Sequence, residues 1–259
     1  EEEFVTGGFK GRIDRIDSVL SDYLPDGCLL SDSKEFSGFK KCEYIRVIDY
    51  KSGHKTLDLD RAYHGLDLQL FTYLNYIRKE FGKNHKDRLI IPSGAYYFHI
   101  DDPVIEFGGG EDAVLKELRF DGITLSGEQN IRLIDGSMAD NKGLVPQAES
   151  GVIKLKTKKD GEPSSTSRLY LGSEMDKLID NSEFEINKSK KRILAGEIYP
   201  KPYSLGSEKG CDYCEYKGLC GFDLKLPGYN FNRLRKIDNK RFFEELSAKL
   251  EGENGNKMD

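Results

Sequence analysis

The chain has 259 residues, enough for one substantial hydrophobic core with a small appendage. Hydrophobic residues make up 37% and charged residues 33%, so the protein is globular, and its net charge of −5 gives no general attraction to DNA phosphates. No stretch approaches the roughly 18 apolar residues of a membrane span, and no secretory leader is present, so we expect a cytoplasmic protein without a membrane partner.

The first half of the chain alternates between strand and helix patterns. Residues 4–20 predict a strand and residues 21–41 a loop, and the apolar segment 42–51 predicts a second strand. Asp60 is placed to cap a helix over residues 61–81, whose apolar side chains recur at helical spacing. Residues 89–100 predict a third strand. The chain begins at Glu1 and enters the first strand pattern almost at once, so we expect it to be part of a longer protein.

The second half predicts helices at residues 111–119, 126–135, 173–194 and 239–250, and a strand at residues 151–158. Together these elements predict an α/β fold in which helices flank a mixed central sheet. We expect three parts: a core over residues 1–205, a cysteine segment over 206–223, and a C-terminal helix with a disordered tail over 224–259.

Two acidic segments carry the main chemical signal. Asp14 lies in the sequence GRIDRID, and Asp49 and Lys51 lie in VIDYK, where residues two apart share one face of a strand. Two carboxylates and the backbone carbonyl of Tyr50 would supply the oxygen ligands that Mg²⁺ or Mn²⁺ prefers. Lys51 could then orient or deprotonate an attacking water, which completes a scheme for phosphodiester hydrolysis. The alternative is a structural ion pair at a strand edge, because the pattern Asp-x-Lys is common.

Three neighbouring residues are interpreted differently. Gln69 and Tyr73 are four residues apart, so they share a helix face that could point at the site, or they lie at the boundary of the core. Asp17 differs from Asp14 by an odd number of residues, and we expect it to be a structural carboxylate paired with an arginine.

The cysteines form a second possible site. Cys211, Cys214 and Cys220 lie close together in a segment rich in turns, which indicates a metal site completed by an outside ligand. Zinc is one metal that such a segment could bind. Three unligated thiols are the alternative, and Cys28 and Cys42 are expected to be ordinary residues.

The motifs GRIDRID, VIDYKSG and YHGLDLQLFTYL resemble the RecB-type nuclease module of the PD-(D/E)XK superfamily. More closely, GAYYFHI followed by Asp102-Pro103, and GCDYCEYKGLCGFD, resemble the B subunits of the AddAB (RexAB) helicase–nucleases. The similarity extends from Gly8 to Asp223, and its short motifs are specific in combination.

The resemblance implies a Mg²⁺-dependent DNA exonuclease domain that resects double-strand breaks for recombinational repair, cutting the 5′-ended strand. Its partners would be an A-type helicase–nuclease subunit and a single strand from an unwound duplex end. The resemblance assigns catalysis and metal binding to Asp14, Asp49 and Lys51, and an accessory motif to Gln69 and Tyr73.

The resemblance also implies a [4Fe–4S] cluster on Cys211, Cys214 and Cys220, with a fourth cysteine preceding Glu1. The family has a histidine before the first strand as well, and none of the four histidines occupies its place, so the isolated chain would lack two family residues. Two other functions compete with this one: a DNA-end binding scaffold with an iron–sulfur staple and no turnover, and a stand-alone nuclease resembling the Cas4 proteins.

Overall fold

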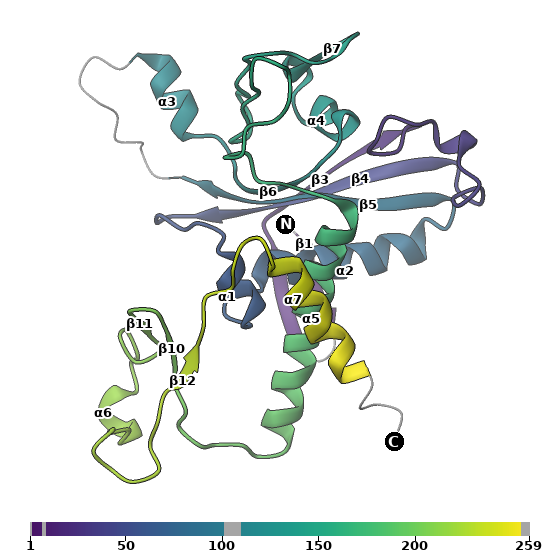
Figure 1. Cartoon of the computed structure of the whole chain (residues 1–259). Coiled ribbons are helices and arrows are strands. Elements are labelled where there is room, and N and C mark those ends of the chain that lie inside the picture. The colour runs from purple at the N-terminus through teal and green to yellow at the C-terminus, as the bar shows by residue number, and fades with distance from the viewer. Residues whose placement is uncertain (1, 7–8, 101–109, 255–259) are drawn as a thin grey trace.

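A five-stranded mixed sheet forms the centre of the molecule (Figure 1). The computed structural model describes residues 2–6, 9–100 and 110–254. The strand order is β3-β4-β5-β6-β9, from β3 (Arg15–Ser21), β4 (Lys41–Lys51), β5 (Arg88–His99), β6 (Asp121–Leu125) and β9 (Leu169–Tyr170). β4 runs parallel to β5 and β6 parallel to β9, whereas the other two pairs are antiparallel. The predicted mixed sheet is therefore confirmed.

Both faces of this sheet are covered, which explains why β4 is buried along almost its whole length. On one face lie α2 (Gln69–Asn84), α5 (Gly172–Leu194) and α7 (Phe242–Asn254), and on the other α3 (Glu111–Glu117) and α4 (Glu128–Ile134) (Figure 1). Neighbouring residues of β4 serve different cores: Val47 packs with the α2 and α5 side, and Ile48 with the α4 side. Because side chains alternate between the two faces of a strand, Asp49 and Lys51 lie on the same face of β4 as Val47, which is the face covered by α2.

The expected single strand over residues 4–20 is wrong. The chain forms a hairpin of β1 (Glu2–Thr6) and β2 (Phe9–Ile13), bends at Asp14, and only then enters the sheet as β3. The hairpin buries Phe4 against Tyr73, with ring centroids 5.7 Å apart. A Cβ at Gly11 would lie 2.5 Å from the Phe4 ring, so this approach requires glycine.

The expected helix over residues 61–81 is divided in two. α1 (Leu59–Tyr63) is capped by Asp58, which accepts a hydrogen bond from the backbone N–H of Arg61, and Asp60 instead accepts one from Ile237. Gly65 then takes a left-handed conformation with φ of +80° before α2 begins at Gln69. The predicted cap was therefore two residues late, and the break places Gln69 in the first turn of α2.

Two other expectations need correction. Residues 151–158 form no strand: the N–H of Ser150 bonds the carbonyl of Leu155 in a tight turn, and Ile153 and Leu155 enter the second core. The C-terminal helix starts at Phe242 instead of residue 239. That helix continues to Asn254, so disorder was wrongly expected for residues 252–254. The rest of the expected tail, residues 255–259, and the Asp102-Pro103 motif lie outside the described residues.

Short elements complete the chain. They are the 3₁₀ turns η1 (Leu30–Asp32) and η2 (Gly136–Met138), β7 (Ala139–Asp140), β8 (Gly143–Leu144), β10 (Tyr203–Leu205), β11 (Glu208–Lys209), α6 (Lys217–Cys220) and β12 (Asn232–Leu234). β11, β10 and β12 form a small sheet beside the helices, which joins segments on both sides of the expected boundary at residue 223 (Figure 1). Within the described ranges, no helix combines the length and the apolar run needed to cross a bilayer.

Candidate active site

Asp49 and Lys51 project from the same face at the end of β4. Asp49 is only 2% exposed, and the ammonium of Lys51 contacts its Oδ2 in an ion pair. Burial raises the pKa of Asp49 because desolvation disfavours its charged form, and the neighbouring lysine partly offsets this. The fold therefore holds a carboxylate at a position where isolation from water is costly, which is typical of functional sites.

Asp14 reaches this strand end from the bend between β2 and β3. Its Oδ2 accepts a hydrogen bond of 2.9 Å from the backbone N–H of Tyr50, the residue between Asp49 and Lys51. The negative charge of Asp14 also contributes to the raised pKa of Asp49, so the two carboxylates are electrostatic neighbours. The bend brings Asp14 here because the β3–β4 ladder ends at the Arg15–Ile48 pair and leaves Tyr50 beyond it.

Gln69, in the first turn of α2, links the acidic and basic groups. Its Nε2 donates to Asp49 Oδ1 at 2.8 Å and to the hydroxyl of Tyr73 at 2.8 Å. Its Oε1 accepts a hydrogen bond of 3.0 Å from Lys51 Nζ. One amide thus fixes both side chains of the β4 pair, and Tyr73, one helical turn further on, fixes the amide. All five expected site residues meet at this end of the sheet.

The oxygen atoms present suit a hard divalent cation. Asp49 Oδ2 is buried and, among the described residues, has no polar partner other than the ammonium of Lys51, so a cation would share this oxygen with Lys51. The N–H of Tyr50 points toward Asp14, and because the two polar groups of a strand residue point to one side, its carbonyl does too. Asp14, Asp49 and this carbonyl together would offer Mg²⁺ or Mn²⁺ oxygen ligands only.

The acidic cluster is small. Across residues 2–6, 9–100 and 110–254, no three His, Cys, Asp or Glu side chains are grouped so that they could hold a metal ion. Mg²⁺ usually binds one or two protein carboxylates and keeps several waters, so Asp14 and Asp49, with the Tyr50 carbonyl as a further ligand, would be enough for such a cation.

Two residues that are close in sequence to the site residues, Tyr50 and Asp17, lie in different surroundings. The side chain of Tyr50 lies outside the core: the residue is 41% exposed, and its ring meets Phe98 edge-on with ring centroids 5.9 Å apart. Asp17 forms hydrogen bonds to Arg15 at 2.8 Å and to Arg46 at 3.4 Å, as expected of a structural carboxylate. Tyr50 therefore belongs to the rim of the site, and Asp17 to the support of β3.

Sequence reasoning missed a second layer beside Lys51. Tyr97, the cross-strand neighbour of Asp49 on β5, donates a hydrogen bond of 3.0 Å from its hydroxyl to Asp67. Asp67 also pairs with Lys55 at 3.1 Å. Lys55 and Asp67 lie in irregular segments, so no periodicity indicates that they meet. The only sequence signal is that Asp67 falls within the motif that also contains Gln69.

Cys211, Cys214 and Cys220 line one open cavity of about 330 Å³, together with Phe222 and Phe231, but in the described structure their thiols are not grouped so that they could hold a metal ion. Cys211 and Cys214 are half-buried, and Cys220 is exposed. In the described structure neither remaining cysteine completes the set: Cys42 is buried in the core, and Cys28 lies in the loop between β3 and β4, far from α6 (Figure 1). These residues alone do not fit a four-thiolate cluster.

Comparison with known proteins agrees with this geometry. Residues 39–221 match the PD-(D/E)XK nuclease superfamily, a range that includes Asp49, Lys51, Gln69 and the clustered cysteines, whereas Asp14 precedes it. Proteins named as the B subunit of an ATP-dependent helicase/deoxyribonuclease are also similar. Those of Lachnoclostridium phytofermentans and Clostridium kluyveri are 29% and 30% identical over 93% of this chain, and one from Bacillus cereus is 29% identical over 94%.

The similarity covers 20%, 19% and 19% of those three relatives, so the chain spans about a fifth of their length. The matched range, the mixed sheet flanked by helices, and the acidic and basic groups at the end of β4 lead to one assignment. The chain belongs to the PD-(D/E)XK nuclease superfamily.

Proposed function

We propose that this chain is the nuclease domain of a helicase–deoxyribonuclease of the two-subunit kind, within its B-type chain, and that it hydrolyses DNA phosphodiesters with Mg²⁺ or Mn²⁺. The observation that carries the proposal is the convergence of Asp14 and Asp49 at one strand end, with Lys51 and Gln69 bonded to the same group of atoms. The names and the similarity of the relatives support the choice of DNA as substrate.

Each residue has a distinct part in the proposed reaction. Asp14, Asp49 and the Tyr50 carbonyl would hold the cation, which when bound polarises a phosphate oxygen and acidifies a bound water. Lys51 orients the attacking water, and Gln69 holds Lys51 and Asp49 in their relative positions. The water oxygen forms the new bond to phosphorus as the bond between phosphorus and the sugar oxygen breaks. One proton of the water ends on the leaving sugar oxygen, which departs as a hydroxyl, and the other passes from the new terminal phosphate to solvent.

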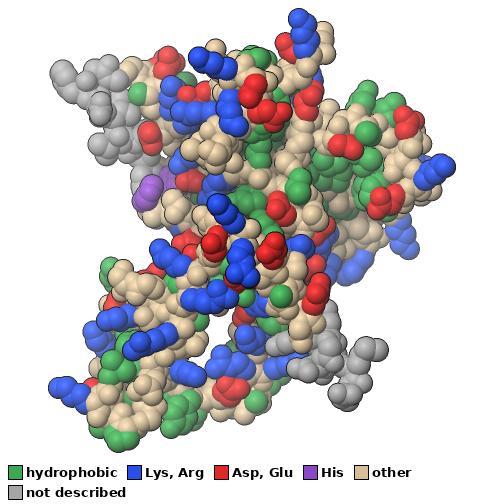
Figure 2. Space-filling model, viewed as in Figure 1, with side chains coloured by type: hydrophobic (Ala, Val, Ile, Leu, Met, Phe, Trp, Pro, Cys, Tyr) green, Lys and Arg blue, Asp and Glu red, His purple; other side chains and the backbone are tan. Residues whose placement is uncertain are grey.

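The charge distribution is compatible with DNA despite the net charge of −5. Figure 2 shows many Lys and Arg side chains, with Asp and Glu among them, where the sheet-containing body meets the smaller lobe with β10 and α6. Lys and Arg side chains near a site can attract phosphates even when the whole molecule is acidic.

The wider role is proposed from the relatives. In a longer protein this domain would act on a single strand from an unwound duplex end and trim the 5′-ended strand during break repair in the cytoplasm. An A-type helicase–nuclease subunit would be its partner. The iron–sulfur cluster belongs to the same proposal, with a fourth thiolate supplied by a segment outside this chain. It would hold the small lobe in place and take no part in hydrolysis.

The test is a nuclease assay of the chain, alone and with the preceding segment of the longer protein restored, on single-stranded DNA with Mg²⁺. We expect wild-type cleavage to disappear with EDTA and in Asp49→Ala and Lys51→Ala variants. Undiminished cleavage by either variant would refute the assignment. DNA binding without turnover in the restored protein would favour the scaffolding function instead.

A further inference from the structure

A second lysine lies beside the proposed active site. Lys55 is in the segment between β4 and α1, and its Nζ lies 5.1 Å from the centroid of the Tyr97 ring. Lys51 Nζ lies 5.3 Å from the same centroid. The charge of Lys55 also acts on Asp49, where it favours the ionised carboxylate. Two ammonium groups therefore contact one aromatic ring next to the acidic pair.

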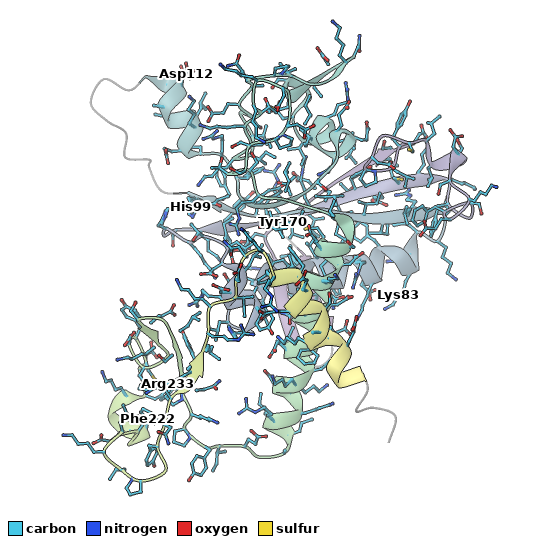
Figure 3. The ribbon with its side chains drawn as sticks, in the orientation of Figure 1. Lys83, His99, Asp112, Tyr170, Phe222 and Arg233 are labelled. Carbon is cyan, nitrogen blue, oxygen red and sulfur yellow. The ribbon has the colours of Figure 1, made fainter. Side chains whose placement is uncertain are left out.

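The position of Lys55 is fixed from two sides. Its ammonium lies 3.1 Å from Asp67 Oδ1, the oxygen to which Tyr97 donates its hydroxyl hydrogen bond. Its backbone carbonyl lies 2.8 Å from Nε2 of His99, at the end of β5 (Figure 3 labels His99 there). The loop that carries Lys55 is thus tied to β5, the strand next to Asp49.

The geometry of Asp67 differs from that of an ordinary surface ion pair. Its side chain is 3% exposed, and its Oδ2 has no hydrogen-bond partner among the residues that the structure describes. A buried carboxylate with one unsatisfied oxygen costs stability, and a pair with a partly exposed lysine returns little of that cost. The Asp67–Lys55 pair therefore contributes little to the stability of the fold, and its main effect is to hold the Lys55 ammonium in place.

Lys55 itself remains accessible. Its side chain is 41% exposed, and an ammonium has three N–H donors, of which the Asp67 contact uses one. Lys51 is more enclosed, at 23%, and both Asp49 and Gln69 contact it. Of the two lysines on the Tyr97 ring, Lys55 has more capacity to bind an additional anion.

We infer that Lys55 is a DNA-binding residue of this site, which contacts a backbone phosphate next to the one that is cut, and that Asp67 is its positioning residue. The inference rests on the proposed nuclease function, because that function places a DNA strand over the end of β4. The Lys55 ammonium neutralises one phosphate, and Asp67 with Tyr97 keeps the ammonium on the side of the sheet where Lys51 acts.

The experiment measures binding apart from cleavage. A fluorescent single-stranded oligonucleotide is titrated with the full chain in EDTA, where metal-dependent hydrolysis cannot occur, over a range of salt concentrations. Loss of one phosphate contact is expected to weaken binding about fivefold to tenfold at low salt. It should also reduce the slope of log K against log salt by about 0.7. We expect both effects in Lys55→Ala and near-complete recovery in Lys55→Arg, which retains the charge.

Lys41→Ala is the matched control. Lys41 is at the opposite end of β4, is also paired with an aspartate, Asp22, and is 45% exposed. It should leave the affinity and the salt slope unchanged. Asp67→Asn should weaken binding less than Lys55→Ala, because the lysine keeps its charge and loses only its fixed position. In Mg²⁺, Lys55→Ala should raise KM and change kcat little.

Other outcomes have equally definite meanings. The inference would be overturned if Lys55→Ala and Lys41→Ala had the same DNA affinity and the same slope of log K against log salt. It would also be overturned if Lys55→Ala bound DNA more weakly with an unchanged slope and a lowered Tm, because that result indicates a structural role. A reduced slope in a protein that never cleaves DNA would support the phosphate contact and reject the nuclease proposal. The two failures are thereby separable.

Discussion

The end of β4 and the cysteine segment both assemble potential ligands, but they do so in different ways. At the end of β4, Asp49 is 2% exposed and every expected residue is joined to another by a hydrogen bond or ion pair. Around the cysteines, Tyr213 is 97% and Leu219 88% exposed. The first site is formed by a packed core that surrounds it. The second has little core of its own, so packing alone does not hold its cysteines in a fixed arrangement.

The largest expected effect tests the preformed site. Asp49→Asn should lower cleavage at least about a hundredfold, because a cation ligand becomes a neutral amide. The Tm of the metal-free protein should stay equal or rise at neutral pH, because burial raises the pKa of Asp49 and its ionised form therefore opposes folding there. Activity and thermal unfolding are measured on one preparation. A marked fall in Tm would show that Asp49 is mainly a structural residue.

The next effect contrasts a cysteine buried in the core of the sheet with the cysteines of the exposed segment. Cys42 is fully buried, and burial raises the pKa of its thiol to about 11, so alkylation of the native protein should be at least about a hundredfold slower there than at Cys220. Peptide mass spectrometry after timed alkylation measures both rates. Slow modification of Cys211, Cys214 and Cys220 together, reversed by a chelator, would mean that a metal organises the segment.

A smaller effect tests the link between α2 and β4. Gln69→Ala should lower kcat about tenfold to a hundredfold, because Asp49 and Lys51 each lose the amide that orients them. Gln129→Ala is the matched control, since Gln129 bonds Ser21 at the far end of β3. Steady-state kinetics of both variants measure the difference. Equal activity would show that the acidic and basic groups keep their places without the amide.

The smallest effect concerns the helices that support the site. Lys79 and Asn75 on α2 hold the pKa of Glu183 on α5 below its usual value of 4.5. Because the folded pKa is lowered, the stabilisation is present above the unfolded pKa and is lost as pH falls through the folded value. Glu183→Gln should therefore lower the unfolding free energy slightly at pH 7, by less than about 1 kcal/mol. The difference should shrink as the pH falls, and urea unfolding at pH 7 and pH 3 measures it.

The sequence predicted well those elements of the fold in which hydrophobic residues recur at regular spacing. The bounds of β4, β5 and α5 were predicted to within about one residue. Each of these elements is long, and its hydrophobic residues follow a regular pattern that indicates the secondary structure directly. The irregular segments were predicted less well. The bend at Asp14 depends on Phe4 reaching α2, and the turn at residues 151–158 depends on the second core. Neither contact has a local signal.

The chemistry of the site divides in the same way. The sequence by itself determined which groups share a face, namely Asp49 with Lys51 on a strand and Gln69 with Tyr73 on a helix, because side-chain direction follows directly from the backbone period. Only the tertiary structure decided that these faces meet, that Asp14 reaches them through a bend, and that Lys55 and Asp67 lie beside them. Contacts between distant segments arise from burial of shared apolar surface, and that surface exists only after the chain has folded.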